Sequence, residues 1–245
     1  DGSAASSGAS SVGYRSRQPG PSRMSLFVDM SLVESSGGSS ISFVQATPRG
    51  VAFDGNPFIP GMQNYYSVVE DGNVIHMYYR CEAPSEISVT TYQDGCYCYA
   101  RSVDGGLSFS KVVVPNRWGN DSNVLDIEYG VHAMHVFVDT KEGISSSERL
   151  KALVAFNERK TGNSYGYISS DGIVWKRVSS NPVLSRSSFL RVRRDFGYAF
   201  DSLNSIHYDS RVGKYVCFAR CVRVRWSRRS FMTQHSSDWL SWAPG

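Results

Sequence analysis

Short apolar runs separated by turn signals dominate the chain after about residue 41. The runs alternate with polar positions and are rich in Val, Tyr, Phe and Ile, as in YYSVV, VIHMYYR, CYCYARS, VHAMHVFVD, LKALVAF, YGYIS and KYVCFAR. Turn-forming steps such as Asp71-Gly72 and Asp171-Gly172 lie between them. Short β-branched and aromatic runs bounded by such turns are typical of strands. Only residues 145–153 have the composition of a helical turn, so we expect an all-β fold.

Three segments repeat one pattern at a fixed spacing. Each runs from a strand into Ser-x-Asp and has an aromatic residue four or five positions later: YARSVDGGLSFSK (99–111), YGYISSDGIVWKR (165–177) and FMTQHSSDWLSWAP (231–244). The aspartates are Asp104, Asp171 and Asp238, and both intervals are 67 residues (171 − 104 and 238 − 171). Equal intervals of this length indicate one supersecondary unit that is repeated.

Two weaker repeats support this unit. Segment 64–81 resembles segment 204–221, and strands that end in Asp occur at Asp54, Asp139 and Asp201. Each unit would hold about four strands, and radially stacked four-stranded units are the blades of a β-propeller, which needs roughly four to eight blades to close. About three such units fit into the chain after residue 41. We therefore expect a partial β-propeller whose open flanks are covered by further sequence or by other protein chains.

The first part of the chain differs in composition from the rest. Residues 1–40 are rich in Ser, Gly and Arg, which predicts a flexible N-terminal tail before a propeller domain at 41–245. The chain begins with Asp rather than Met, which we interpret as a processed product or a fragment. No run of about 18 apolar residues occurs, so we expect no membrane-spanning helix.

The charge of the chain is modest, but its basic residues are clustered. The net charge is +4, with 20 Arg against 6 Lys, and eight of the arginines lie in RVRRDF and ARCVRVRWSRRS. This cluster is consistent with a solvated basic surface or with a site for an anionic partner such as an acidic glycan. Nucleic acid is disfavoured as a partner, because no RNA-binding aromatic signature or zinc-finger spacing accompanies the arginines.

The five cysteines leave several interpretations open. They are Cys81, Cys96, Cys98, Cys217 and Cys221, and the odd count leaves at least one unpaired within the chain. One or two disulfides in an oxidising compartment, or buried thiols, would both fit. No His lies at a spacing that would complete a zinc site, so neither a metal nor another cofactor is expected. A secreted or extracellular location is slightly favoured.

Several motifs resemble those of known propeller families. SVDGGLSF (102–109) fits the Asp-box pattern Ser-x-Asp-x-Gly-x-x-Phe of sialidase-like propellers, in which the box is structural. Over about residues 50–245 the chain resembles the five-bladed propeller superfamily of glycoside hydrolases, the arabinofuranosidase, xylosidase and fructofuranosidase kind. The resemblance depends on the order of short motifs: CYCYARSVDG, Asn123 with HVFVD, ERLKAL, SSDGIVW, DSLN, Lys-Tyr-Val and RSFMTQHSSDWLSW.

The resemblance implies a site of axial carboxylates that binds or hydrolyses a glycan. In that superfamily, acidic residues of the innermost strands converge on a funnel, which implies catalytic roles for Asp54, Asp139 and Asp201. Asn204 and Arg220, in the matched segments, are the candidates for substrate binding through sugar hydroxyls, and a structural role fits both equally well. No glutamate can be matched to the general acid, so whether the chain is an enzyme stays open. The alternative is an inactive propeller that serves as a structural subunit or scaffold in a larger assembly.

Overall fold

The computed structural model describes residues 50, 52–53, 64–82, 95–114, 122–128, 131–156, 163–226 and 228–242. The chain divides into two compact units, residues 1–49 and 50–245, and every described residue belongs to the second. The predicted tail at 1–40 and the candidate Asp54 therefore lie outside the described residues. Among the helices that are described, none has the length and apolar character of a membrane span.

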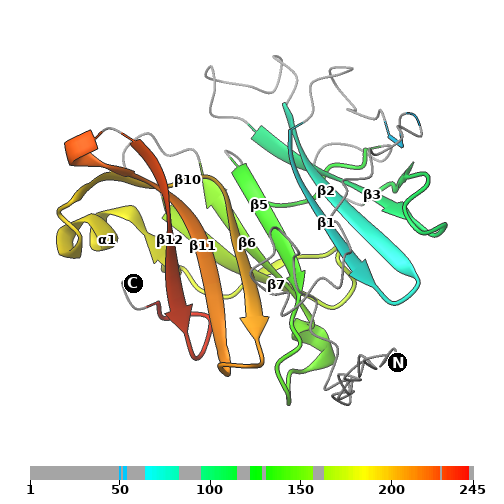
Figure 1. The fold of residues 1–245 in the computed structure, drawn as a ribbon. Helices are drawn as coiled ribbons and strands as arrows, with labels where there is room; N and C mark the ends of the chain where they lie inside the picture. The colour runs from blue at the N-terminus through cyan, green and yellow to red at the C-terminus, as the bar shows by residue number, and fades with distance from the viewer. Residues whose placement is uncertain are drawn as a thin grey trace, which may run out of the picture. The chain divides into compact units, whose positions relative to one another are not determined.

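The described residues form three antiparallel sheets with little helix (Figure 1). The first sheet contains β1 (Asn64–Asp71), β2 (Val74–Glu82), β3 (Gly95–Ser102) and β4 (Ser110–Lys111). The second contains β5 (Val131–Val138), β6 (Leu150–Phe156), β7 (Asn163–Ser169), β8 (Lys176–Arg177) and β9 (Leu184–Ser185), which pairs with β7. The third contains β10 (Phe196–Asp209), β11 (Lys214–Arg223) and β12 (Arg228–Ser236).

The helical segments are short. Within the described residues they are the α-helix α1 (Arg186–Val192) and the 3₁₀ turns η2 (Ser146–Glu148) and η3 (Val224–Trp226). The 3₁₀ turn η2 falls within residues 145–153, where the composition predicted a helical turn, and β6 begins two residues after it. The expectation of an all-β fold is confirmed.

The sheets stack so that the first strand of each lies beside the first strand of the next. β5 contacts both β1 and β10, and Figure 1 shows it between the other two. An apolar core separates the first sheet from the second, with Tyr78, Met134 and Trp175 among its members. A second core, which includes Leu153 and Trp239, separates the second sheet from the third. This stacking of sheets about their inner strands is that of a partial β-propeller.

The second sheet explains why some runs lack alternation. All seven residues of β6 are buried, Lys151 included, because β6 pairs with β5 and β7 at its edges and has a core on each face. A short continuous apolar run bounded by turns is what such a strand requires. The run LKALVAF therefore lacks polar alternation because both faces of β6 are buried.

The three Ser-x-Asp segments form equivalent turns after β3, β7 and β12. In each turn the serine hydroxyl donates to the aspartate two positions later: Ser102 to Asp104 at 2.6 Å, Ser169 to Asp171 at 3.0 Å and Ser236 to Asp238 at 2.9 Å. The amide of each aspartate donates back to the same hydroxyl at 3.3 Å. The equivalence that the 67-residue spacing predicts is confirmed.

The cysteines form one disulfide within the first sheet. Cys81 and Cys96 face each other across β2 and β3 and are bonded. Cys98, Cys217 and Cys221 are buried free thiols. Burial raises the pKa of Cys217 to about 12, so this thiol behaves as a small apolar side chain.

Candidate ligand site at the ends of the inner strands

Strand pairing aligns the three sheets residue by residue. The serines of the equivalent turns pair with the start of the second strand in each sheet, as Ser102 with Ile75, Ser169 with Leu150 and Ser236 with Tyr215. Positions on β2, β6 and β11 can therefore be matched by counting from Ile75, Leu150 and Tyr215. This alignment shows which of the predicted site residues are equivalent.

An aspartate ends each inner strand or directly follows it, but Asp201 is not one of these aspartates. Asp71 pairs with Val74, Asp209 pairs with Lys214, and the Asp139 amide donates to the Arg149 carbonyl at 2.8 Å. Val74, Arg149 and Lys214 are matched positions, so Asp71, Asp139 and Asp209 are equivalent. The predicted repeat of Asp139 with Asp201 is wrong, because Asp139 lies at the end of its inner strand and Asp201 lies near the beginning.

Asp139 is buried and its carboxylate is fully engaged. Its side chain accepts hydrogen bonds from the Lys151 ammonium, from the Tyr215 hydroxyl at 2.7 Å and from the Lys141 amide at 3.0 Å. Lys151 belongs to the second sheet and Tyr215 to the third. In the structure the Asp139 carboxylate therefore joins two successive sheets.

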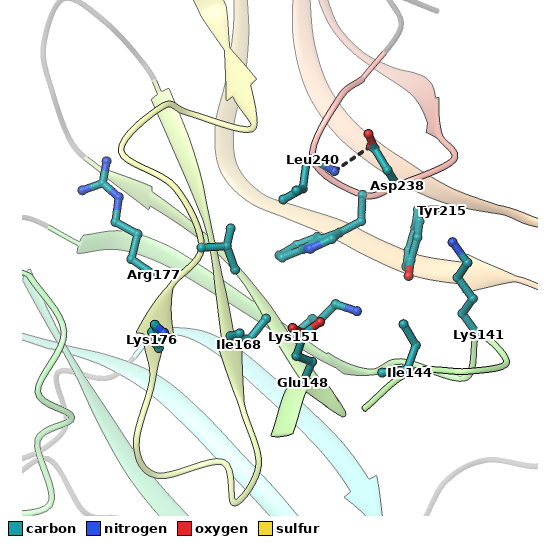
Figure 2. A pocket seen from close by; sticks show the side chains of 12 residues that line it. Lys141, Ile144, Glu148, Lys151, Ile168, Lys176, Arg177, Tyr215, Asp238 and Leu240 are labelled. Carbon is teal, nitrogen blue, oxygen red and sulfur yellow. Dashed lines mark hydrogen bonds between the residues drawn. The ribbon is translucent and has the colours of Figure 1, made fainter. Parts of the chain in front are cut away.

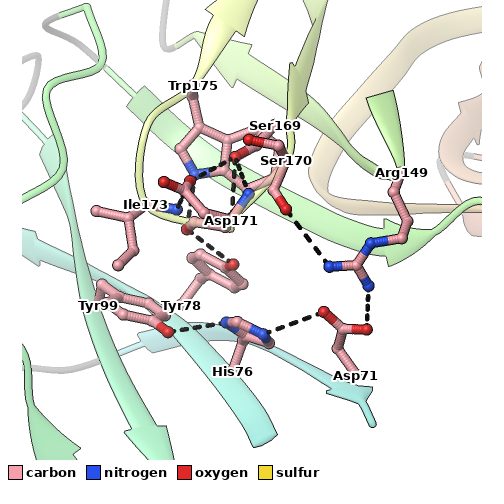
Figure 3. A network of polar contacts seen from close by, with 11 residues as sticks. Asp71, His76, Tyr78, Tyr99, Arg149, Ser169, Ser170, Asp171, Ile173 and Trp175 are labelled. Atoms are coloured by element: carbon pink, nitrogen blue, oxygen red, sulfur yellow. Dashed lines mark hydrogen bonds and ion pairs between the residues drawn. The ribbon is translucent and has the colours of Figure 1, made fainter. Parts of the chain in front are cut away.

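Asp71 makes the matching connection between the first and second sheets (Figure 3). Its carboxylate pairs with the Arg149 guanidinium of the second sheet and lies 3.6 Å from the His76 ring. His76 occupies the position that Lys151 has in the second sheet, and its Nδ1 lies 2.8 Å from the Tyr99 hydroxyl. Burial lowers the pKa of His76, an effect that the neighbouring Asp71 carboxylate opposes. Asp71 and Asp139 therefore have the same structural role, since each connects its own sheet to the next one.

Asp201 lies at the opposite end of the sheets. It pairs with Arg220 on β11, whereas Asp209, which matches Asp139, pairs with Lys214 at the hairpin. The structure thus does not bring Asp139 and Asp201 together. Asp201, Asn204 and Arg220 do lie at one end of the third sheet.

All three inner strands break their pairing near this same end. The register shifts between Asn64 and Ser67 in β1, between Val131 and Ala133 in β5, and between Asp201 and Ser205 in β10. These breaks lie within about two residues of the matched positions Arg80, Ala155 and Arg220. β-Bulges turn side chains away from the regular pleat and are over-represented beside active sites.

Strained backbone lies in the β1 break and in a second break of β10, between Ala199 and Asp201. Tyr65 in β1 has φ 50° and Phe200, directly before Asp201, has φ 63°. Residues with a side chain rarely adopt this left-handed conformation, and such strain clusters at functional sites. The strained segments of the first and third sheets thus coincide with the end that carries Asp201.

Asn204 stabilises the bulge in β10 through two hydrogen bonds of its side chain. Its side-chain amide donates to the Phe200 carbonyl at 3.3 Å, and its Oδ1 accepts from the Arg220 amide at 3.3 Å. The side chain is 2% exposed. Asn204 therefore holds the looped backbone that carries Asp201, while Arg220 lies directly across the ladder from Asp201.

Buried and half-buried side chains connect the inner strands to one another next to the bulges. The Tyr97 hydroxyl donates to the Tyr65 carbonyl at 3.1 Å and accepts from the Met134 amide at 2.8 Å, so it joins β1 to β5. The Tyr65 and His132 rings lie 5.1 Å apart. His135 Nε2 lies 3.0 Å from the Ile206 carbonyl, which joins β5 to β10, and burial lowers the pKa of this ring.

Asp126 is a further carboxylate near this end, and the sequence motifs do not predict it as a site residue. The Leu125 amide donates to the Tyr97 carbonyl at 2.8 Å, and the exposed Asp126 follows as the chain crosses towards β5. Its signal in the sequence is weak, because LDIEYG matches no repeat of the chain. Only the folded molecule shows the place of Asp126, because residues 123–125 pair with β3.

Comparisons with known proteins concern the fold. No family model matches the chain, and no curated protein matches it. The fructan 1-exohydrolase IIa from Cichorium intybus is 10% identical, with a TM-score of 0.52 over 79% of this chain and 34% of that one. The GH32 β-fructofuranosidase BmSUC1 of Bombyx mori is 12% identical, with a TM-score of 0.48 over 74% and 34%. A putative glycosidase from Bacteroides thetaiotaomicron is 19% identical, with a TM-score of 0.46 over 75% and 50%.

The chain spans between about a third and a half of the length of these structures. At 10% identity, the match to the fructan exohydrolase shows a shared fold over that part and nothing about activity.

Proposed function

We propose that this chain is part of a glycosidase-type propeller and binds a glycan at the bulged end of its inner strands. The observation that carries the proposal is the coincidence of Asp201 with that end, where three inner strands break their pairing and Phe200 is strained. A carboxylate accepts hydrogen bonds from sugar hydroxyls, and the guanidinium of Arg220, across the ladder, donates to sugar oxygens. Asn204 acts on the ligand through the backbone of the bulge.

Hydrolysis would need a second carboxylate beside Asp201, and the Asp139 predicted for this role lies at the other end of the sheets. Glycosidic hydrolysis uses two carboxyl groups, about 5–10 Å apart, on either side of the scissile bond. Asp139 is enclosed by Lys151 and Tyr215 at the far end, so we assign it a structural role. Asp201 is the proposed ligand carboxylate, with Asp54 and Asp126 as the candidates for a second one.

Glycan binding by matched variants tests the proposal. The purified chain is screened by calorimetry against oligosaccharides of the fructan, arabinan, xylan and mannan classes. We expect Asp201→Asn to weaken binding about tenfold or more, or about 1.4 kcal/mol, with unchanged unfolding. Asp209→Asn is the control, since Asp209 lies on the same strand at the other end. Absence of binding to every class, or equal losses in both variants, would contradict the proposal.

A second candidate function, docking into a protein assembly, is favoured by the outer face of the third sheet. Phe218 is 43% exposed, whereas the matched Tyr78 and Leu153 are 0% and 2% exposed under the following sheet. Phe231 is 84% exposed, whereas Tyr97 at the matched position of the first sheet is 1% exposed. The face that neighbouring sheets cover twice in this molecule is therefore open to solvent on the third sheet.

Sedimentation of the isolated chain over a range of concentrations tests this second candidate. Burial of the open face predicts self-association or binding to another chain, and Phe231→Ser should reduce it. Leu107→Ser is the matched control, because Leu107 is 78% exposed on a turn of the first sheet. A monomer that unfolds cooperatively at all concentrations would argue against a scaffold role.

A further inference from the structure

A cavity of about 480 Å³ lies between the second and third sheets, at the end opposite the bulges (Figure 2). Its walls come from β7, β8, the residues around η2, the start of β11 and the turn at 238–240. The size is within the range of small-molecule sites in proteins.

The matched space between the first and second sheets is filled by aromatic side chains. There Tyr78 pairs across the ladder with Tyr99, and its hydroxyl donates to the Gly172 carbonyl at 2.9 Å. The Trp175 ring packs edge-on against Tyr78, with 5.8 Å between the ring centroids (Figure 3). At the matched positions the second sheet has Leu153 and Gly166. The interface between the second and third sheets therefore lacks the two tyrosine rings that the interface between the first and second sheets has.

Trp239 partly replaces them and adopts a strained conformation to do so. A Cβ added to Gly166 would lie 2.8 Å from the Trp239 ring, so the glycine makes room for the indole. Trp239 has φ 63°, whereas the matched turn positions are Gly105 with φ 74° and Gly172 with φ 76°. A residue with a side chain rarely adopts this left-handed conformation, which persists only where the surroundings hold it. Of the three equivalent turns, the one at 238–240 borders the cavity. Its strained residue, Trp239, lies with its indole against that cavity.

The cavity combines apolar walls with both donors and acceptors. Ile168, Val178 and Leu240 supply apolar surface beside Trp239. The Glu148 carboxylate can accept hydrogen bonds, and the Lys141 and Lys176 ammonium groups can donate them. Figure 2 shows these groups on several sides of the space.

The charges around the cavity balance once their pairs are counted. Lys151 is paired with Asp139, and Arg177 holds Glu128 through two hydrogen bonds of 2.9 and 3.0 Å. Lys141 and Lys176 then face Glu148 and Asp238, two cations against two anions. A balanced set of donors and acceptors suits a neutral ligand with many hydroxyl groups better than an anion.

We propose that this cavity binds a small neutral saccharide of one or two rings. The apolar walls with Trp239 would pack against the C–H surface of a sugar ring, while Glu148, Lys141 and Lys176 exchange hydrogen bonds with its hydroxyls. The site is separate from the end that carries Asp201, so it does not depend on the function proposed there.

Saturation-transfer NMR with simple mono- and disaccharides tests the inference on the whole chain. We expect transfer to at least one sugar, binding in the millimolar range, and a shift of the Trp239 indole N–H signal on titration. Glu148→Gln and Lys176→Met should each weaken binding about tenfold.

Matched controls separate this site from the rest of the molecule. Glu142→Gln and Lys214→Met change exposed charges that do not line the cavity and should leave binding unaltered. Asp201→Asn should also leave it unaltered, which separates this site from the one proposed at the bulges. The inference is overturned if no sugar gives transfer, if the Trp239 signal does not move, or if the cavity variants bind as the unaltered protein does.

Discussion

Asp139 and Lys151 form an ion pair whose side chains are 0% and 2% exposed, at the boundary between the second and third sheets. The Tyr215 hydroxyl of the third sheet completes the carboxylate's hydrogen bonds. Buried charges are tolerated only when each is paired and its remaining hydrogen bonds are satisfied. The pair thus makes the position of one sheet depend on that of the next.

Removing the Asp139 charge should destabilise the fold. In Asp139→Asn the Lys151 ammonium stays buried without its counter-ion, and breaking a buried pair in this way costs about 3–5 kcal/mol. Chemical denaturation measures the free energy of unfolding. The double variant Asp139→Asn with Lys151→Met should recover most of the loss, because no charge then stays buried. An Asp139→Asn protein as stable as the original would contradict the structural role.

The contact between Gly166 and Trp239 predicts an intolerance to one methyl group. Gly166→Ala puts a Cβ within 2.8–2.9 Å of the indole, so the ring or the strand must shift. Overpacking of this kind costs about 1–3 kcal/mol. Gly197→Ala is the control, since its Cβ would meet the nearest side chain at an ordinary 3.4 Å. Thermal unfolding compares the two, and equal melting temperatures would contradict the packing described here.

The repeated turns could be predicted from sequence because their interactions are local. Ser169 and Asp171 are two residues apart, and the hydrogen bonds that define the turn stay within a few residues of them. Residue types at fixed short spacing therefore determine the conformation. The 67-residue interval then located the same turn on three sheets.

The carboxylate site could not be predicted in the same way because it depends on register. Asp139 and Asp201 both follow an apolar residue at a strand position, and nothing local shows that one lies at the end of an inner strand and the other at a bulge near its beginning. The extra residues between Asp201 and Ser205 shift everything before them relative to β11. Sequence distance from a motif does not predict which residues pair when one strand contains extra, unpaired residues.

The Tyr97 hydroxyl offers a test of how the inner strands are joined. It bonds the Tyr65 carbonyl at 3.1 Å and the Met134 amide at 2.8 Å. Tyr97→Phe leaves both backbone groups buried without this partner, at a cost of about 1–3 kcal/mol for each unsatisfied group. Tyr208→Phe, at a half-buried ring of the third sheet, should cost less. Denaturation of both variants gives the difference, and a smaller loss for Tyr97→Phe than for Tyr208→Phe would refute the assignment.

The buried His76 and the half-buried His135 predict how stability depends on pH. Burial lowers the pKa of His76, with Asp71 opposing the effect and Arg149 and Arg101 adding to it. Burial also lowers the pKa of His135, with the Ile206 carbonyl opposing the effect and His207 adding to it. In the unfolded chain both rings have the ordinary pKa of about 6.5. Between the lowered pKa and this value the unfolded state binds more protons, so stability is present above about pH 6.5 and is lost as the pH falls.

We therefore expect a lower melting temperature at pH 5.5 than at pH 7.5. His76→Gln and His135→Gln should each flatten this dependence, because the variant side chains do not titrate. His235→Gln is the control, since this ring is exposed on the third sheet and contributes to neither pKa shift. Scanning calorimetry at the two pH values measures the effect for all four proteins. A profile that stays equally steep in both variants would show that the protons bind elsewhere and that neither ring is held neutral by the packing of the inner strands and their neighbours.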